Sequence, residues 1–283
     1  MKQRILVAVV GVPALLAVLC AAPDWATLAL LMGLCIIASH ELLAAVLPPE
    51  KTRRWWGLAA TLAVFVVANV YFSHERFAGT AAAELMPWLL AALVVVLFLC
   101  MVLEYGKKEE MDFTALCAIL VAGAAIPLAL SCLLRLRLLN YGGGLVLMPL
   151  VAAFMSDSAA LFTGMACGKH KLAPIVSPKK TVEGAVGGVV CNIVFLCLYT
   201  LLLNKCFGFT QVNYFYAAIY GVLGAVASIV GDLTLSVVKR QGGIKDYGNL
   251  IPGHGGILDR FDSTMLVAPL TELLILLIPF AVK

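Results

Sequence analysis

The stretch LMPWLLAALVVVLFLCMVL, residues 85–103, decides the class of fold because it contains no charged side chain. An α-helix of about 20 apolar residues is long enough to cross the roughly 30 Å hydrocarbon core of a bilayer. The stretch therefore predicts a membrane-spanning helix. The number of further apolar runs of similar length determines how much of the chain lies within the membrane.

The composition of the whole chain follows the same pattern. Of its 283 residues, 63% are hydrophobic and 13% are charged, and the mean hydropathy is +1.02. An ordinary soluble domain has roughly 45–50% apolar and about 25% charged residues. These values exclude a disordered chain and a soluble enzyme with a single membrane anchor. The net charge of +4 is too small to indicate nucleic-acid binding.

Repeated apolar runs predict an all-α polytopic membrane protein with about nine transmembrane helices. We expect a single integral-membrane domain over residues 1–283, in which the spans of 1–134 carry no motif and 143–283 forms the catalytic region. The predicted spans are 5–22, 25–47, 55–73, 85–103, 113–134, 143–166, 185–204, 213–237 and 264–282.

Basic residues divide unevenly between the loops of this layout. With the N-terminus in the cytoplasm, fifteen of the 20 lysines and arginines fall on the cytoplasmic side and five on the other. Cytoplasmic loops carry such an excess. The pattern predicts a cytoplasmic N-terminus, and the short loops favour a bacterial inner membrane. The nine cysteines lie mostly in apolar runs, without C-x-x-C pairs, and are interpreted as small core residues.

Three acidic residues inside the predicted spans stand out, because an ionisable group near the centre of a membrane helix costs at least ~2.5–3.5 kcal/mol. Glu41 follows His40, and the favoured interpretation is a hydrogen-bonded pair that faces the bundle interior. Asp157 lies between two serines and is expected to face a polar cavity open to the cytoplasm. Asp232 lies about 10 Å from the cytoplasmic end of its helix, at 1.5 Å per residue.

Asp232 belongs to a polar stripe. Ser228, Asp232 and Ser236 recur every four residues, and Lys239 follows, so all four lie on one helical face. A polar seam between helices is the structural alternative. A carboxylate that leads toward a cluster of cations favours a functional site.

The loop that follows the stripe combines cations, glycines and carboxylates. Its basic residues would suit a polyphosphate: Lys239, Arg240, Lys245 and Arg260. The segment GHGG, residues 253–256, leads into the last predicted helix, so free N–H groups are expected there as an anion site. Asp259 and Asp262 either cap that helix or gather with Asp232 as oxygen ligands of Mg²⁺. The chain has neither a P-loop nor a dinucleotide-binding glycine motif.

An earlier loop, residues 168–184, carries a second basic group. Lys179 and Lys180 precede Thr181, a candidate helix cap, and Glu183. Ordinary cytoplasmic charge before a capped helix explains this loop equally well when it is taken alone. Its presence on the same predicted side as the first loop favours a shared phosphate site.

The motif S-x₂-KR-x₄-KD-x-G-x₂-IP-x-HGG-x₂-DR-x-D, from Ser236 to Asp262, resembles the signature of the phosphatidate cytidylyltransferase family, also called CDP-diacylglycerol synthases. It matches every fixed position of that signature. The segment SPKKTVEG, residues 177–184, resembles a second recurrent segment of the family. Two departures are Val182, where tryptophan is common, and Tyr247, where serine is common.

The resemblance implies that CTP and phosphatidic acid react to give CDP-diacylglycerol and pyrophosphate, with Mg²⁺ required and K⁺ as a candidate second cation. It implies Asp232 and Asp259 as metal ligands. It implies catalytic roles for the four basic residues of the signature loop. The remaining candidate substrate-binding residues are Asp157, Ser177, Lys179, Lys180, Thr181, Glu183, Asp246, His254 and Asp262. A homodimer in the lipid bilayer is a further hypothesis.

Two other functions stay open at this point. A CTP-dependent lipid-alcohol kinase would transfer the γ-phosphoryl group instead of the cytidylyl group. An ion-coupled transporter would use Asp157, Asp232 and Glu41 as ion sites, but carriers usually show paired halves, and the polar motifs here are concentrated in the second half of the chain.

Overall fold

The computed structural model describes residues 2–207, 209, 211–250, 255–279 and 281–282, and it is dominated by helices. The chain divides into two compact units. The first unit comprises Met1–Leu138 together with Gln241–Arg260, and the second comprises Leu139–Arg240 together with Phe261–Lys283. Part of the signature loop therefore belongs with the N-terminal helices, whose own sequence carries no motif.

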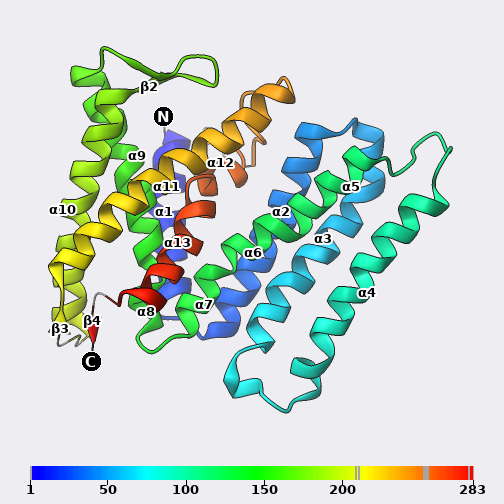
Figure 1. Cartoon of the computed structure of the whole chain (residues 1–283), viewed down its shortest axis with the longest axis horizontal. Helices are drawn as coiled ribbons and strands as arrows, with labels where there is room; N and C mark the ends of the chain where they lie inside the picture. The colour runs from blue at the N-terminus through cyan, green and yellow to red at the C-terminus, as the bar shows by residue number, and fades with distance from the viewer. Residues whose placement is uncertain (1, 208, 210, 251–254, 280, 283) are drawn as a thin grey trace. The chain divides into compact units, whose positions relative to one another are not determined.

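Long apolar helices that lie side by side build the first unit (Figure 1). The predicted span 113–134 is one helical run, Phe113–Leu138, in which the π-helical turn η2 follows α5 directly and a turn at Ser131 separates α6 from α7. In chain order the elements are α1 (Lys2–Cys20), α2 (Asp24–Val46), α3 (Pro49–Phe72), the 3₁₀ turn η1 (Glu75–Phe77), α4 (Ala81–Leu103), α5 (Phe113–Leu120), η2 (Val121–Ala125), α6 (Ile126–Leu130), α7 (Cys132–Leu138) and the start of α12 (Leu258–Phe261).

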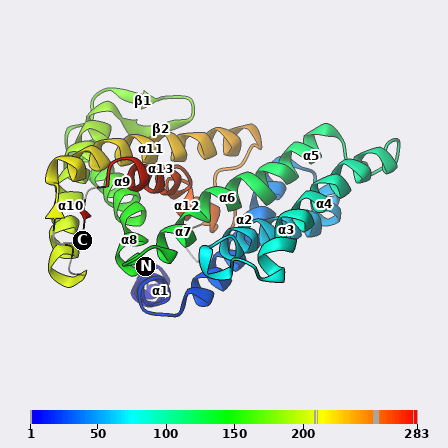
Figure 2. The ribbon, with the colours of Figure 1, turned by 60° about the horizontal axis from the view of Figure 1, so that its bottom comes forward.

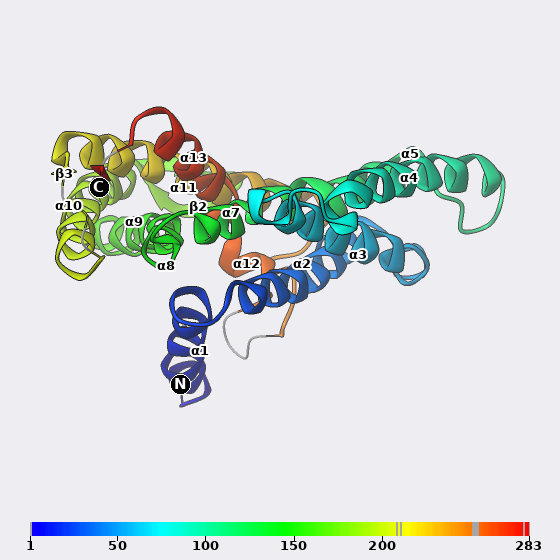
Figure 3. The ribbon, with the colours of Figure 1, turned by 90° about the horizontal axis from the view of Figure 1, so that it is seen from below.

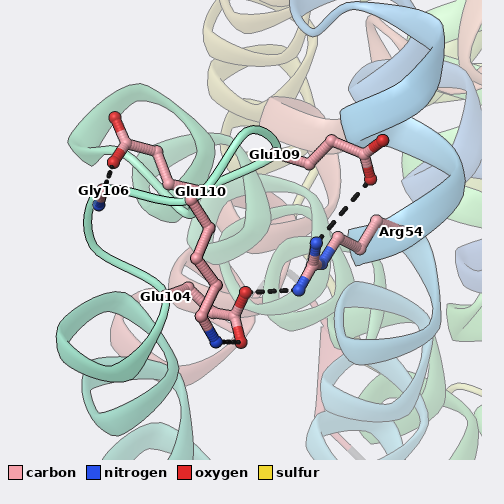
Figure 4. A network of polar contacts seen from close by, with 6 residues as sticks. Arg54, Glu104, Gly106, Glu109 and Glu110 are labelled. Carbon is pink, nitrogen blue, oxygen red and sulfur yellow. Dashed lines mark hydrogen bonds and ion pairs between the residues drawn. The ribbon is translucent and has the colours of Figure 1, made fainter.

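Charged groups gather where α4 ends and α5 begins. Arg54 of α3 pairs with Glu104 and, at 3.7 Å, with Glu109, while Lys107 lies 2.8 Å from Glu104 (Figure 4). Lys107 and Arg54 hold the pKa of Glu104 below its ordinary value. Asp112 caps α5, because its Oδ1 accepts a 2.8 Å hydrogen bond from the N–H of Ala115. Exposed ion pairs of this kind contribute little to stability, so the apolar faces hold the helices together.

Helices, one short β-hairpin and a second pair of short strands build the second unit (Figure 1, Figure 2). β1 and β2 pair antiparallel, with Lys171 opposite Thr181, and β3 pairs with β4. The elements are α8 (Gly142–Leu145), α9 (Leu147–Cys167), β1 (Lys171–Ala173), β2 (Ser177–Thr181), α10 (Val182–Phe207), β3 (Gln211–Val212), α11 (Tyr214–Gln241), α13 (Thr264–Leu277) and β4 (Ala281–Val282).

The core of the second unit lies between α9, α10, α11 and α13. Met148, Leu196, Tyr220 and Val267 are buried there, one from each helix. The hydroxyl group of Tyr220 is satisfied within the protein, since it donates a 3.1 Å hydrogen bond to the carbonyl of Ile278. This packing holds α9, α10, α11 and α13 together, and α9 and α11 carry polar residues described below.

In the part of the chain that the structure describes, seven helices are long and apolar enough to cross a membrane, which confirms an all-α polytopic membrane protein. They are Asp24–Val46, Pro49–Phe72, Ala81–Leu103, Phe113–Leu138, Gly142–Cys167, Val182–Cys206 and Tyr214–Gln241. Within the described residues, the apolar part of α1 (Gly11–Cys20) and α13, with 14 residues, are shorter than that limit. The count of nine spans and the cytoplasmic N-terminus stay predictions.

The cysteines do not all occupy core positions. Cys35 and Cys132 are buried, but Cys167 and Cys206 are exposed near the C-terminal ends of α9 and α10. The core interpretation is therefore wrong for these two residues, since an apolar run in a membrane protein covers the outer face of a helix as well as its packed face.

Candidate active site

Asp157 of α9 joins three elements of the second unit. Its Oδ1 accepts a 2.8 Å hydrogen bond from the hydroxyl of Ser228 in α11, and its Oδ2 accepts one of 2.7 Å from Ser263, directly before α13. Asp157 thus faces protein hydroxyl groups. Ser263 was not predicted from the sequence as a partner of Asp157, and the only hint of such a role was its position next to Asp262. The two hydroxyls satisfy a carboxylate that an apolar environment would otherwise penalise.

Asp232 of α11 lies beside the β1–β2 hairpin. Its Oδ2 is 2.5 Å from the ammonium group of Lys180 in β2, and its Oδ1 accepts a 3.0 Å hydrogen bond from Ser236 one turn further along α11. The predicted stripe is confirmed as one face of a continuous helix, on which Ser228, Ser236 and Lys239 are buried.

Asp262 is the third carboxylate of this group. Its burial and the negative charges of Asp232 and Asp157 raise its pKa to about 7, against the opposing effects of Lys239 and of the Ser263 N–H. The second unit therefore brings together what we call the carboxylate cluster, Asp157, Asp232 and Asp262, with the cations of Lys180 and Lys239 beside it.

Close backbone contact keeps this cluster compact. A Cβ atom on Gly231 of α11 would lie 2.7 Å from the carbonyl oxygen of Asp262 and 3.2 Å from the Cα of Ser263. Because only glycine lacks that atom, α11 can pack directly against the segment that carries Asp262.

The hairpin that supplies Lys180 is fixed at both ends. Thr181 caps α10, as predicted, because its hydroxyl oxygen accepts a hydrogen bond from the N–H of Gly184 at 3.1 Å. The Glu183 carboxylate accepts hydrogen bonds from the N–H groups of Lys169 and His170 and lies 2.6 Å from the His170 ring. At the turn, Arg240 donates to the carbonyl of Val176 at 3.2 Å, which ties the end of α11 to the hairpin. Figure 2 shows the hairpin alongside α11.

For two further predicted residues of the hairpin, the structure gives the exposure of the side chain. Lys179 is exposed, and Ser177, opposite Ala173 in the ladder, is half-buried. The sequence treated residues 168–184 as a loop, and the short strands went unrecognised because SPKKT has no alternation of apolar and polar residues.

The first unit holds the other part of the signature. Lys245, Asp246 and Arg260 are exposed, and Asp259 is 8% exposed. The Asp259 Oδ2 atom accepts hydrogen bonds from the N–H of Tyr247, at 2.8 Å, and from the N–H of Gly256, at 3.0 Å. His254 lies outside the described residues.

The expectation of free N–H groups after the GHGG segment is wrong for residues 256–258. Asp259 takes the N–H of Gly256, and Glu41 takes those of Ile257 and Leu258. The predicted last helix is also interrupted, since α12 ends at Phe261 and α13 begins at Thr264.

The partner assigned to Glu41 was also wrong. Its carboxylate is buried, as expected, but it binds backbone N–H groups of the signature loop instead of His40. His40 is exposed and lies edge-on to the ring of Trp56. The sequence singled out Glu41 because a carboxylate inside an apolar span is energetically costly. No motif near Glu41 linked it to the signature loop.

These features define a polytopic membrane protein in which buried or half-buried carboxylates of two helices lie beside lysine side chains. A model of the cytidylyltransferase family matches residues 2–278, and the chain belongs to that family. It is therefore a nucleotidyltransferase.

Curated relatives agree with the family. The chain is 30% identical over 220 residues to a phosphatidate cytidylyltransferase of Staphylococcus haemolyticus, and this match covers 78% of this chain and 79% of the relative. It is 32% identical over 205 residues to that of Bacillus subtilis, with 72% of each chain covered. It is 37% identical over 181 residues to that of Haemophilus influenzae, with 61% and 62% covered.

Proposed function

We propose that the chain transfers the cytidylyl group of CTP to phosphatidic acid, which gives CDP-diacylglycerol and pyrophosphate. The observation that carries the proposal is the carboxylate cluster beside Lys180 and Lys239. Asp262 and Lys239 come from the segment that resembles the family signature, and Lys180 comes from the second recurrent segment. Membership of the cytidylyltransferase family and the names of the relatives support it.

The reaction needs positioning and neutralisation of charge more than a strong base. A phosphate monoester has a second pKa of about 6, so its oxygen is already anionic near neutral pH. That oxygen would attack the α-phosphorus of CTP, the bond from this phosphorus to the bridging oxygen would break, and pyrophosphate would leave with the electron pair. Cations placed on the leaving group lower the barrier.

Mg²⁺ suits the carboxylate donors proposed for it, Asp232 in the second unit and Asp259 in the first. Carboxylate oxygens are the protein ligands that Mg²⁺ prefers, and substrate phosphates usually complete its coordination. The raised pKa of Asp262 reflects burial and an excess of negative charge around it, which a divalent cation would offset. Among the described residues, no three histidine, cysteine or acidic side chains form a metal site by themselves. The bound ion would supply Lewis-acid stabilisation of the phosphates.

The residue roles follow the resemblance. We assign Asp232 and Asp259 as Mg²⁺ ligands, and Lys179 and Lys180 to a phosphate of CTP or of the lipid. The remaining carboxylates, Asp157, Asp246 and Asp262, would orient the cations. The pyrophosphate would be neutralised by Lys239, Arg240, Lys245 and Arg260.

The site would face the cytoplasm, where CTP is found, in a bacterial inner membrane. The acyl chains of phosphatidic acid would stay in the bilayer while the headgroup reaches the polar residues. K⁺ as a second cation and a homodimer are further parts of this proposal, and the positive-inside count supports the orientation.

Following two labels from CTP tests the reaction. Purified full-length protein in detergent is given phosphatidic acid, Mg²⁺ and CTP labelled at either the α- or the γ-phosphorus, and label in the lipid phase is counted. We expect label from the α position alone. Label from the γ position alone would establish a lipid kinase instead, and no lipid label from either position would contradict both kinds of transfer.

A further inference from the structure

Glu41 occupies a place in the first unit that no motif predicts. It lies on the buried face of α2, and 5% of its surface is exposed. A buried carboxylate is costly unless hydrogen-bond donors surround it. The groups that donate hydrogen bonds to the Glu41 carboxylate therefore indicate its role.

Both carboxylate oxygens of Glu41 bind the backbone of the signature loop. Oε1 accepts a 3.0 Å hydrogen bond from the N–H of Ile257, and Oε2 accepts one of 2.7 Å from the N–H of Leu258. Figure 3 shows α12, which begins at Leu258, beside α2. The first N–H groups of a helix have no partner within it, so an ionised carboxylate is well suited to bind them.

A second carboxylate continues the same arrangement. Asp259 binds the N–H of Gly256 and reaches the other side of the loop at the N–H of Tyr247. Three consecutive amides, from Gly256 to Leu258, are thus held by Asp259 and Glu41 together. Movement of the Glu41 carboxylate would disturb the backbone that carries Asp259.

Two glycines leave room for Glu41. A Cβ atom on Gly256 would lie 2.4 Å from Glu41 Oε1, and one on Gly248 would lie 2.6 Å from the same atom. Real Cβ atoms do not approach an oxygen so closely. Both sides of the loop therefore contact the carboxylate directly.

We infer that Glu41 is a positioning residue for cytidylyl transfer: it fixes the backbone at residues 256–258 and thereby the placement of Asp259 and Arg260. The inference rests on the role proposed above for the signature loop. It also assigns a task to the N-terminal helices, since α2 supplies the contact that orders a catalytic segment distant in sequence.

Glu41→Gln tests the inference in the full-length protein. The amide keeps the shape of the side chain, but its NH₂ group faces an N–H donor instead of accepting from it. We expect kcat to fall by about 10- to 100-fold, because small displacements of reacting groups cost up to roughly 100-fold. We expect KM for phosphatidic acid to stay within about twofold, and peptides that cover residues 255–258 to exchange their amide hydrogens faster.

Two further variants separate positioning from loss of folding. Gly256→Ala disturbs the same contact from the loop side and is expected to lower kcat in the same way, whereas Gly33→Ala on α2, with no atom within 4 Å of the added Cβ, serves as its control. Glu50→Gln, at an exposed site on α3, is the control for Glu41→Gln.

The outcomes are distinct. A kcat of Glu41→Gln within about threefold of wild type, or unchanged exchange at residues 255–258, would overturn the inference. A fall in rate that matches only the fraction of unfolded protein would overturn it as well. If the wild-type chain transfers no cytidylyl group, the proposed function fails, and the exchange measurement still reports whether Glu41 holds the loop.

Discussion

The ammonium group of Lys180 lies 2.5 Å from Oδ2 of Asp232, although one residue belongs to the hairpin strand β2 and the other to helix α11. The contact joins the two segments that the sequence singled out independently. About a fifth of each side chain is exposed, at 22% and 23%, so the pair is partly screened by solvent. The ion pair therefore contributes modestly to stability, and it also holds a positive charge beside Asp232.

Replacing Lys180 with methionine keeps the length of the side chain and removes its charge. We expect kcat/KM for CTP to fall roughly 10- to 100-fold, since each tenfold corresponds to about 1.4 kcal/mol of transition-state stabilisation. Lys205→Met, in the last turn of α10, is the matched control. Steady-state rates at varied CTP measure the effect, and equal rates for the two variants would refute a role for Lys180.

Asp262 gives the stability of the protein a pH dependence. Its pKa is about 7 in the folded state, against an ordinary value of 3.8, so between these pH values the folded protein keeps a proton that the unfolded chain loses. Stability from this group is therefore lost as pH rises toward 7, and the loss levels off above the folded-state pKa, where both states are ionised. Asp262→Asn cannot ionise, and its Tm should increasingly exceed that of wild type from pH 5 to about pH 7 and then exceed it by a constant amount up to pH 8.

Thermal unfolding in detergent without Mg²⁺ measures this difference. Asp246→Asn, at an exposed site, is the control and should show a small, pH-independent change. A Tm difference for Asp262→Asn that stays constant from pH 5 to pH 8 would show that the residue is already ionised in the folded protein.

Gly231→Ala tests the close packing of α11. The new Cβ would lie 2.7 Å from the Asp262 carbonyl oxygen, and overpacking of this kind costs about 1–3 kcal/mol. We expect a lower Tm and a lower kcat, because the segment with Asp262 must move. Gly57→Ala on α3 meets no atom within 4 Å and should leave Tm unchanged or raise it. Equal Tm values for the two variants would contradict the packing argument.

Local periodicity explains which parts of the site could be predicted. The spacing of Ser228, Asp232 and Ser236 gives one helical face whatever the rest of the fold does, and Thr181 caps α10 through a contact three residues away. Seven of the predicted spans likewise follow from apolar runs long enough to cross a bilayer.

Long-range contacts explain what could not be predicted. The pairing of Glu41 with Leu258 joins residues more than 200 positions apart, and no pattern near either residue reports it. The hydrogen bonds from Ser228 and Ser263 to Asp157 depend on the packing of three helices in the same way. The assumption that the amides after GHGG are free failed because nearly all buried backbone donors are paired with an acceptor, and here the acceptors are the carboxylates of Glu41 and Asp259.

The measurement that tests the central claim most directly is the initial rate of lipid labelling from α-labelled CTP by Asp232→Asn at saturating Mg²⁺. The account predicts a rate at or below about one-thousandth of wild type, since loss of about 4 kcal/mol of stabilisation corresponds to that factor. The variant must elute and melt as the wild-type protein does. A folded variant that labels lipid within about threefold of the wild-type rate would contradict the account.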